Sequence, residues 1–203
     1  MGNIRETDAI LHVLRCFDDD NIIHVDGNID PIRDKETIDI ELQLKDLEAV
    51  DKKLEKTKRA AKTGNKEAQR EMSVLEKLKT GLETGKSVRA LEISEEDRED
   101  IVKPMQLITD KPVMYVCNVD EGSAVNGNAH VDRVMASVTD EDAEVLVLAV
   151  GIEADIAELE DYEERKLFLE DIGLEEAGAG KLIRSAYRLS LSLIPIRRCR
   201  RVE

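Results

Sequence analysis

The stretch Asn118-Val119-Asp120-Glu121 joins an amide and two carboxylates directly after an apolar run that ends at Cys117. In open parallel sheets, ligands bind beyond the carboxyl ends of the strands, where an asparagine and an acid can hydrogen-bond the edge of a purine. The same pattern is common in ordinary turns, because Asn and Asp side chains bond nearby backbone groups. Asn118 and Glu121 are therefore candidate base-binding residues, with a structural turn as the alternative.

Two glycine-containing stretches are similar to phosphate-binding loops, but neither fits that motif. The motif requires Gly, four residues, Gly-Lys and then Ser or Thr, at a junction between a strand and a helix. The stretch from Gly81 to Ser87 has three residues between its glycines and follows a helical segment, where glycine commonly ends the helix. Gly178-Ala179-Gly180-Lys181 is followed by Leu182, which has no hydroxyl for magnesium. We interpret the first stretch as a helix end and the second as a loop that enters the last helix.

Three apolar runs predict the strands that must position these residues. They lie at 8–17, 113–117 and 145–150, with helical segments between and after them. Near-continuous apolar strands are typical of parallel sheets, so the first run is expected to be buried on both faces. Helices are expected near 155–159, at 163–171 and from about 176 to 193, packed on the sheet. The predicted fold class is α/β with a parallel sheet.

Between the first and second strands, a seven-residue repeat predicts a long amphipathic helix. Its members are Ile40, Leu47, Leu54 and Ala61, with Leu44 and Val50 on the same face. Thr63-Gly64-Asn65 supplies a helix end and a new N-cap, and helical spacing resumes at Ala68. The pattern identifies no buried polar or catalytic residue in this pair of helices. We expect an antiparallel helical hairpin, which forms an arm inserted into the α/β domain.

The net charge of −15 is unevenly distributed along the chain. Residues 139–176 carry fifteen acidic side chains against two basic ones, so this segment should repel nucleic acid. In residues 52–66 the sign reverses, and Glu55 is the one acid among seven cations, namely Lys52, Lys53, Lys56, Lys58, Arg59, Lys62 and Lys66. This basic cluster at the tip of the arm can meet an anionic partner, and a solvated helix tip is the alternative.

Length and composition bound the class of protein. The 203 residues, 41% of them hydrophobic, suffice for one core or for one domain with an excursion. No apolar run approaches the roughly 18 residues that span a bilayer, and the first residues do not form a signal peptide. The three cysteines, Cys16, Cys117 and Cys199, are far apart, which argues against a disulfide framework or a thiolate metal site. We therefore expect a cytoplasmic protein with free thiols and no metal site.

Several segments between residues 3 and 193 carry a family resemblance. They are Asn-Ile-Arg-Glu-Thr-Asp-Ala-Ile at 3–10, Asn-Ile-Ile-His-Val at 21–25, Ile-Asp-Pro at 29–31, Lys-Glu-Ala at 66–68, Asn-Val-Asp-Glu at 118–121, Ile-Glu-Ala-Asp-Ile-Ala-Glu-Leu at 152–159 and Phe-Leu-Glu-Asp-Ile-Gly-Leu-Glu-Glu at 168–176. Together they resemble the YchF family of Obg-like ATPases.

This resemblance implies part of a P-loop NTPase (Rossmann-like) sheet of the translation-factor class, with a coiled-coil arm. Members of the family hydrolyse ATP, and sometimes GTP, with Mg²⁺, and they associate with ribosomes. Asn118 and Glu121 match the family's base-binding Asn-x-x-Glu, and Ala149-Val150 takes the place of a small Ser/Cys-Ala pair that helps to hold the base. His24 matches a loop histidine proposed to place the attacking water. Taken alone, a histidine after an acidic turn is more often an exposed loop residue.

The chain departs from the family pattern at both ends. The Walker lysine, both switch regions and the Asp-x-x-Gly that supports Mg²⁺ precede the family segment that matches 3–7, and they are absent here. Because phosphoryl transfer depends on these groups, we expect ATP or GTP to bind weakly, without Mg²⁺ ligands, and catalysis to be crippled. The C-terminal TGS domain is also absent. The basic tail after Leu193 is expected to be a frameshifted end, with an arginine-rich nucleic-acid arm as the rival explanation.

These expectations divide the chain into a partial nucleotide-binding domain at 1–36, the helical coiled-coil arm at 37–93, the remainder of the nucleotide-binding domain at 94–193 and an aberrant basic tail at 194–203. The leading interpretation is an internal fragment of a YchF-like nucleotide-binding protein. Whether it is an enzyme stays open, because the family is a hydrolase but the Walker and switch motifs are missing. The alternative is a non-enzymatic module that binds the ribosome, RNA or a protein through the basic tip of the arm. No membrane partner is expected.

Overall fold

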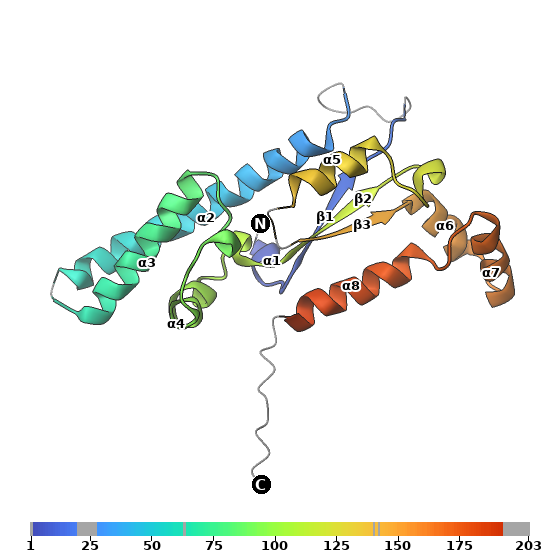
Figure 1. The fold of residues 1–203 in the computed structure, drawn as a ribbon. Coiled ribbons are helices and arrows are strands. Elements are labelled where there is room, and N and C mark those ends of the chain that lie inside the picture. Colours follow the sequence, from blue (N-terminus) through green and yellow to red (C-terminus); the bar gives the residue numbers. More distant parts are fainter. Residues whose placement is uncertain (1, 20–27, 63, 140, 142, 193–203) are drawn as a thin grey trace, which may run out of the picture. The chain divides into compact units, whose positions relative to one another are not determined.

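The computed structural model describes residues 2–19, 28–62, 64–139, 141 and 143–192. The chain forms two compact units, one of residues 1–10 with 32–112 and the other of residues 11–31 with 113–203. The first unit contains a helical hairpin, and the second contains most of a β-sheet with its helices (Figure 1).

In the described residues the sheet has three strands, in the order β1 (Ile10–Arg15), β2 (Val113–Asn118) and β3 (Glu144–Leu148). β2 and β3 are parallel, with Val116 opposite Leu146. β1 runs in the same direction. The N–H of Ile10 donates to the oxygen of Pro112 at 3.0 Å and that of Cys16 to the oxygen of Asn118 at 2.7 Å, an equal advance along both strands. The expected α/β fold with a parallel sheet is confirmed.

The expectation that the first strand is buried on both faces is wrong. Leu14 and Cys16 are buried, whereas Leu11 is 43% and Val13 is 60% exposed. Among the described strands β1 lies at an end of the sheet, and successive side chains of a strand point to opposite faces. One face of β1 is therefore covered and the other is open. The central strand, β2, is buried from Val113 to Cys117.

The helices that accompany these strands in the second unit include α5 (Ala129–Ser137), α6 (Val150–Glu158), α7 (Tyr162–Asp171) and α8 (Gly178–Ser192). α8 packs on one face of the sheet, where Leu182 and Leu189 contact a cluster of Met114, Val116 and Leu148. α6 buries Ile152 and Ile156.

The expectation that α7 packs on the sheet is wrong, because this helix has no buried residue. Its apolar side chains Leu167, Phe168 and Leu169 are consecutive, so they spread around the helix and do not form a stripe along it. Leu167 is 65% exposed, and the acidic residues of the helix surround it. The helix therefore stands on the surface of the second unit.

The hairpin of the first unit consists of α2 (Pro31–Ala61) and α3 (Lys66–Glu83). Asn65 caps α3, because its side chain accepts from the N–H groups of Glu67 and Ala68 at 2.9 and 3.2 Å. Two ion pairs show that the helices are antiparallel, since Asp51 pairs with Lys79 and the later Lys53 pairs with the earlier Glu71, each at 2.8 Å. The expected helical arm is confirmed.

The apolar repeat of α2 is only partly covered. Val50 and Leu54 are buried in a cluster with Leu75 and Leu78 of α3. Ile40 and Leu44 stay 55% and 54% exposed, although they belong to the same repeat. The reason is length: α2 has 31 residues and α3 has 18, so the first turns of α2 have no α3 beside them.

The chain beyond α3 continues in short helical segments: η1 (Val88–Ala90), α4 (Glu95–Asp97), η2 (Arg98–Val102), η3 (Lys103–Met105) and η4 (Ile108–Asp110), while α1 (Gly2–Arg5) precedes the sheet. The Gly81–Ser87 stretch ends α3, as expected, because the N–H of Lys86 donates to the oxygen of Gly81 at 2.9 Å. A Cβ on Gly81 would lie 2.6 Å from Cδ1 of Leu91, so a larger residue here would force the Leu91 side chain to move.

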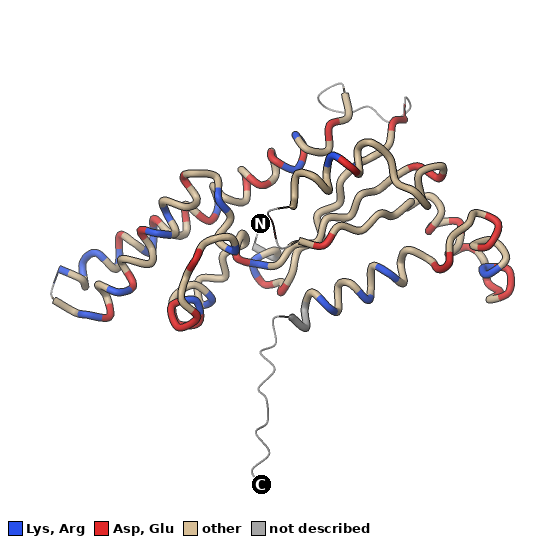
Figure 2. The backbone as a smooth tube through the Cα atoms, viewed as in Figure 1, with Lys and Arg blue, Asp and Glu red and all other residues tan. Residues whose placement is uncertain are grey.

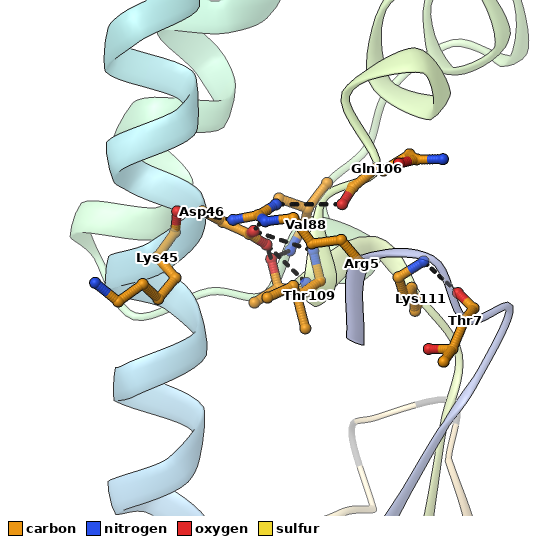
Figure 3. A network of polar contacts seen from close by, with 9 residues as sticks. Arg5, Thr7, Lys45, Asp46, Val88, Gln106, Thr109 and Lys111 are labelled. Atoms are coloured by element: carbon orange, nitrogen blue, oxygen red, sulfur yellow. Dashed lines mark hydrogen bonds and ion pairs between the residues drawn. The ribbon is translucent and has the colours of Figure 1, made fainter. Parts of the chain in front are cut away.

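The root of the arm contains a buried carboxylate (Figure 3). Asp46 is 0% exposed and accepts hydrogen bonds from the N–H groups of Ile108 and Thr109 at 3.0 and 2.7 Å. It also accepts from the hydroxyl of Thr109 at 2.8 Å and from the guanidinium of Arg5 at 3.1 Å. Arg5 donates in addition to the carbonyl oxygens of Lys45 at 3.0 Å and Gln106 at 3.2 Å.

The expectation that the hairpin has no buried polar residue is therefore wrong. Besides Asp46, Thr57 is 5% exposed, and its hydroxyl donates to Glu71 at 2.8 Å. The partners of both residues lie on other segments of the chain, so the spacing of residues within α2 did not indicate them.

We expect Asp46→Asn to lower the free energy of unfolding by about 3–5 kcal/mol, because an amide NH₂ would then face donors that now meet a carboxylate oxygen. Urea unfolding followed by circular dichroism measures the loss. The control is Asp51→Asn, which removes an exposed pair with Lys79 and should cost less than about 1 kcal/mol. Equal losses in the two variants would contradict the role given to Asp46.

Candidate functional site

Backbone bonds join the loops that follow the three strands. The N–H of Val119 donates to the oxygen of Leu148 at 2.9 Å, beside the bond from Cys16 to Asn118. Asn128 adds a side-chain link, because its Nδ2 donates to the carbonyl oxygen of Cys16 at 2.7 Å. The carboxyl ends of β1, β2 and β3 are therefore held in one arrangement.

Asn128 also begins α5, and the sequence analysis missed it. Its Oδ1 accepts from the N–H groups of His130 and Val131 at 3.0 and 3.1 Å. The available signal was an asparagine directly before an amphipathic segment, which is a helix-start pattern. This pattern does not reveal the second hydrogen bond of Asn128, to Cys16, which directly follows β1 and lies more than a hundred residues earlier in the chain.

Asn118 ends β2 with its side chain half-buried. Its Oδ1 accepts from the N–H of Val150, the first residue of α6, at 3.0 Å, and the buried Ala149 precedes that helix. Its Nδ2 has no hydrogen-bond partner among the described residues. The structure thus brings Asn118, Ala149 and Val150 together, and it leaves the amide NH₂ of Asn118 available to a ligand.

Glu121 lies on the short segment η5 (Glu121–Ser123) after β2. Asp120 forms the turn there, because its carboxylate accepts from the N–H and the hydroxyl of Ser123 at 2.9 and 3.1 Å. The carboxylate of Glu121 is exposed and makes no hydrogen bond or ion pair with a described residue. The turn and the candidate ligand-binding acid are therefore two different residues.

A small cavity adjoins Ala149 and is also lined by Leu148, Ile152 and Gly178. Its volume of about 20 Å³ admits a water-sized molecule and no purine ring. A base at this edge of the sheet would have to lie on the open side, next to Asn118 and Glu121.

The glycine-rich stretch at Gly178 forms the first turn of α8, whereas the sequence predicted a loop that enters this helix. The carboxylate of Glu153 accepts from the N–H groups of Gly178 and Ala179 at 2.6 and 2.9 Å. This acid on α6 supplies the cap that the local sequence lacks, so the helix starts at the first glycine. The chain's own anion fills the position that a phosphate would take at this N-terminus.

Two buried thiols lie near the same strand ends. Cys16 and Cys117 are free and 0% exposed. A hydrogen bond to the Cys117 sulfur, together with burial, raises the pKa of the Cys16 thiol, so this group stays protonated. Cys199 lies outside the described residues.

The remaining candidate residues fall on other parts of the chain. His24 lies outside the described residues. In the basic cluster, Lys53 pairs with Glu71 along the hairpin, whereas the other cations are exposed, namely Lys52, Lys56, Lys58, Arg59, Lys62 and Lys66 (Figure 2). From Lys56 onward, no side chain of the cluster has a hydrogen bond or ion pair with a described residue. The tip of the arm therefore presents several unpaired positive charges.

In the described part of the chain, no group of three or more His, Cys, Asp or Glu side chains is placed to hold a metal ion. No helix of that part is long and apolar enough to cross a membrane.

No protein-family model matches the chain. The chain is 44% identical over 191 residues to the protein named ribosome-binding ATPase YchF of Bacillus subtilis. It is 45% identical over 189 residues to the protein of that name from Haemophilus ducreyi, and 43% identical to the one from Escherichia coli O157:H7. These matches cover 93% of this chain and 51–52% of each relative, so the chain spans about half the length of the curated relatives it matches.

The fold is also similar to a solved structure, that of the Schizosaccharomyces pombe YchF GTPase, with a TM-score of 0.83 and 29% sequence identity. The similarity covers 93% of this chain and 52% of that protein.

We expect Asn118→Ala to expose the first turn of α6 to solvent, because the N–H of Val150 loses its acceptor. The loss is local and small, about 0.5–1.5 kcal/mol, so amide hydrogen exchange is the suitable measurement. Exchange at Val150 should accelerate by about two- to tenfold, since roughly 1.4 kcal/mol corresponds to a factor of ten. The exposed Asn126 is the matched control, and Asn126→Ala should leave this exchange unchanged. Unaltered exchange in Asn118→Ala would show that the bond does not hold the helix start.

Proposed function

We propose that this chain, which matches the YchF family over 93% of its length, contains the base-binding half of a YchF-type nucleotide site. One observation carries the proposal. The Asn118 oxygen is fixed on the N–H of Val150 while its Nδ2 has no described partner, and this arrangement lies at the carboxyl end of the central strand. That edge is where ligands of parallel α/β sheets bind.

The chemistry of these groups suits a purine. The Nδ2 of Asn118 can donate to a ring nitrogen, because the bond to Val150 already orients the amide. The exposed carboxylate of Glu121 can accept from an exocyclic amino group. The backbone at Ala149 and Val150 stands where the family has its small pair, and it offers main-chain contacts without a hydroxyl or thiol. We propose these four residues as the base-binding set, and His24 as the residue that matches the family's loop histidine.

This chain offers fewer groups that could bind the phosphates of ATP or GTP. Its 203 residues contain no Gly-x₄-Gly-Lys-Ser/Thr motif, and Glu153 already occupies the N-terminus of α8. Mg²⁺ neutralises phosphate charge when it is bound, but the described residues offer no cluster of ligands for it. We therefore propose weak nucleotide binding with crippled catalysis.

The basic tip of the arm supports a second candidate function, a non-enzymatic one. Its cations from Lys56 onward have no described partner, and several of the relatives are named as ribosome-binding proteins. A helix end with unpaired lysines and an arginine can contact RNA phosphates. We propose a contact between this tip and ribosomal RNA, which places the chain in the cytoplasm.

For the nucleotide site, we expect the purified chain to bind ATP with a Kd of about 1 mM or weaker, because the phosphates lack a cradle. Isothermal titration calorimetry measures the binding, and a phosphate-release assay should detect no hydrolysis. Asn118→Ala should abolish the residual binding, whereas the control Asn126→Ala should not. Phosphate release above the buffer level that disappears in Asn118→Ala would refute the crippled catalysis, and equal binding by both variants would refute the base site.

For the arm, we expect the triple variant Lys56→Ala, Arg59→Ala and Lys62→Ala to bind ribosomes or ribosomal RNA more weakly and with a flatter dependence on salt. Each lost phosphate contact should reduce the slope of log K against log salt by roughly one. Sedimentation with ribosomes across a salt series measures both quantities. The matched control removes three other exposed lysines, Lys86, Lys103 and Lys166, and should keep the original slope. If the two triple variants respond alike, the tip has no specific role.

A further inference from the structure

A groove of about 590 Å³ lies between the side of α8 and the strand β3. Its volume is within the roughly 300–1,000 Å³ that is typical of ligand clefts. Leu146 supplies an apolar lining from the strand, and Tyr187, which is 68% exposed, supplies an aromatic ring from the helix. The groove lies within the second unit, and Asn118 does not line it, so neither proposed function uses it.

α8 runs antiparallel to β3 along this groove. Gly178, at the start of the helix, is next to Leu148, at the end of the strand. Near the other end, Glu144 accepts from Ser185 at 2.7 Å and from Arg188 at 2.9 Å. Residues that follow one another on α8 therefore line the groove in the reverse order of β3.

The helix presents positive charge to the groove through Lys181, Arg184 and Arg188. Arg184 pairs with Glu176 and Arg188 with Glu144, both in exposed geometry. The side chain of Lys181 has no hydrogen bond or ion pair with a described residue. Exposed pairs exchange partners at little cost, since they are worth about 0–1 kcal/mol. The groove is therefore lined by one cation without a described partner, Lys181, and by two cations that can exchange their present partners for a ligand, Arg184 and Arg188.

The outer edge of β3 adjoins the groove, which Glu144 and Leu146 of this strand line. It is the end strand of the described sheet, so no described strand pairs with that edge. The carbonyl of Leu148 bonds to Val119 after β2 and thus points toward β2. Along a strand the backbone groups alternate in direction, so those of Val145 and Val147 point outward. An added extended segment can hydrogen-bond to these groups.

We propose that this groove binds an extended acidic peptide segment, which adds to the edge of β3 and places carboxylates on Lys181 and Arg184. Alternate side chains of an extended peptide are roughly 6.6 Å apart, and successive turns of a helix are about 5.4 Å apart. Acids at every second position can therefore reach the cations of α8. The side chains between them point to the opposite face of the sheet.

The surrounding charge favours a peptide over a nucleic acid. Residues 139–176, which include Glu144 and Glu176 of the groove, carry fifteen acids against two cations. A nucleic acid strand would bring one phosphate per nucleotide past this acidic surface. A peptide can place its few carboxylates at the cations alone.

The test uses a fluorescein-labelled peptide of alternating glutamate and valine, with fluorescence anisotropy as the readout on the full chain. We expect a Kd in the micromolar range. The double variant Lys181→Glu and Arg184→Glu should weaken binding by at least about tenfold, and Lys181→Ala, which breaks no described ion pair, by about threefold. The matched control Arg165→Glu and Lys166→Glu places the same charge change on α7 and should bind nearly as the parent chain does. Circular dichroism establishes that each variant is folded.

Two further probes separate the parts of the proposal. The same peptide methylated on alternate backbone nitrogens should lose at least about tenfold in affinity, because pairing with β3 needs those N–H groups. A peptide of alternating lysine and valine should not bind. Oligouridine that binds more tightly than the acidic peptide, an acidic peptide that does not bind at about 1 mM, or equal binding by the groove and control variants would each overturn the proposal.

Discussion

A carboxylate without access to water needs donors from the protein itself, and at Asp46 they come from segments far apart in the sequence. Arg5 arrives from the N-terminal end and Thr109 from the short helices after the arm. Because each bond has one favourable distance and direction, α2 cannot slide or turn on the segment around Thr109 without leaving a buried charge partly unpaired. The apolar cluster of Val50, Leu75 and their neighbours adds stability to the hairpin, and the buried carboxylate fixes its position.

At the strand ends of the second unit, uncharged side chains likewise join segments that are far apart in the sequence. Asn118 bonds to the start of α6, and Asn128 bonds to the end of β1. Both asparagines therefore use one side-chain atom to join two segments that the chain visits separately. Such an arrangement is set before any ligand arrives, which lowers the entropy lost on binding. The side chain of Glu121 has no such bond, so a ligand would have to fix its conformation on binding.

The sequence was informative wherever the signal was local or periodic. The apolar runs located β2 and β3, the seven-residue repeat and Asn65 located the hairpin, and family motifs located Asn118. It was misleading wherever the outcome depended on a distant partner. Val13 looked like a core residue because nothing within its strand reveals that the strand lies at an end of the described sheet. Asp46 was not identified as a buried residue because its donors lie at 5 and at 108–109. Gly178 looked like a loop residue because its cap, Glu153, belongs to another helix.

The unequal lengths of α2 and α3 affect how stiff the arm is along its length. Asp46 lies near the middle of α2, and fifteen residues separate it from the end of that helix at Ala61, a length of about 22 Å at 1.5 Å per residue. Beyond the point where α3 ends, α2 continues without α3 beside it; Ile40 and Leu44 are exposed there, whereas Pro31 and Lys35 in its first turns are buried. Two packed helices resist bending more than one does, so the arm is stiffer between Asp46 and its tip than in the first turns of α2. A force applied at the lysine-rich tip would therefore act on the hydrogen bonds around Asp46, at the root of the arm.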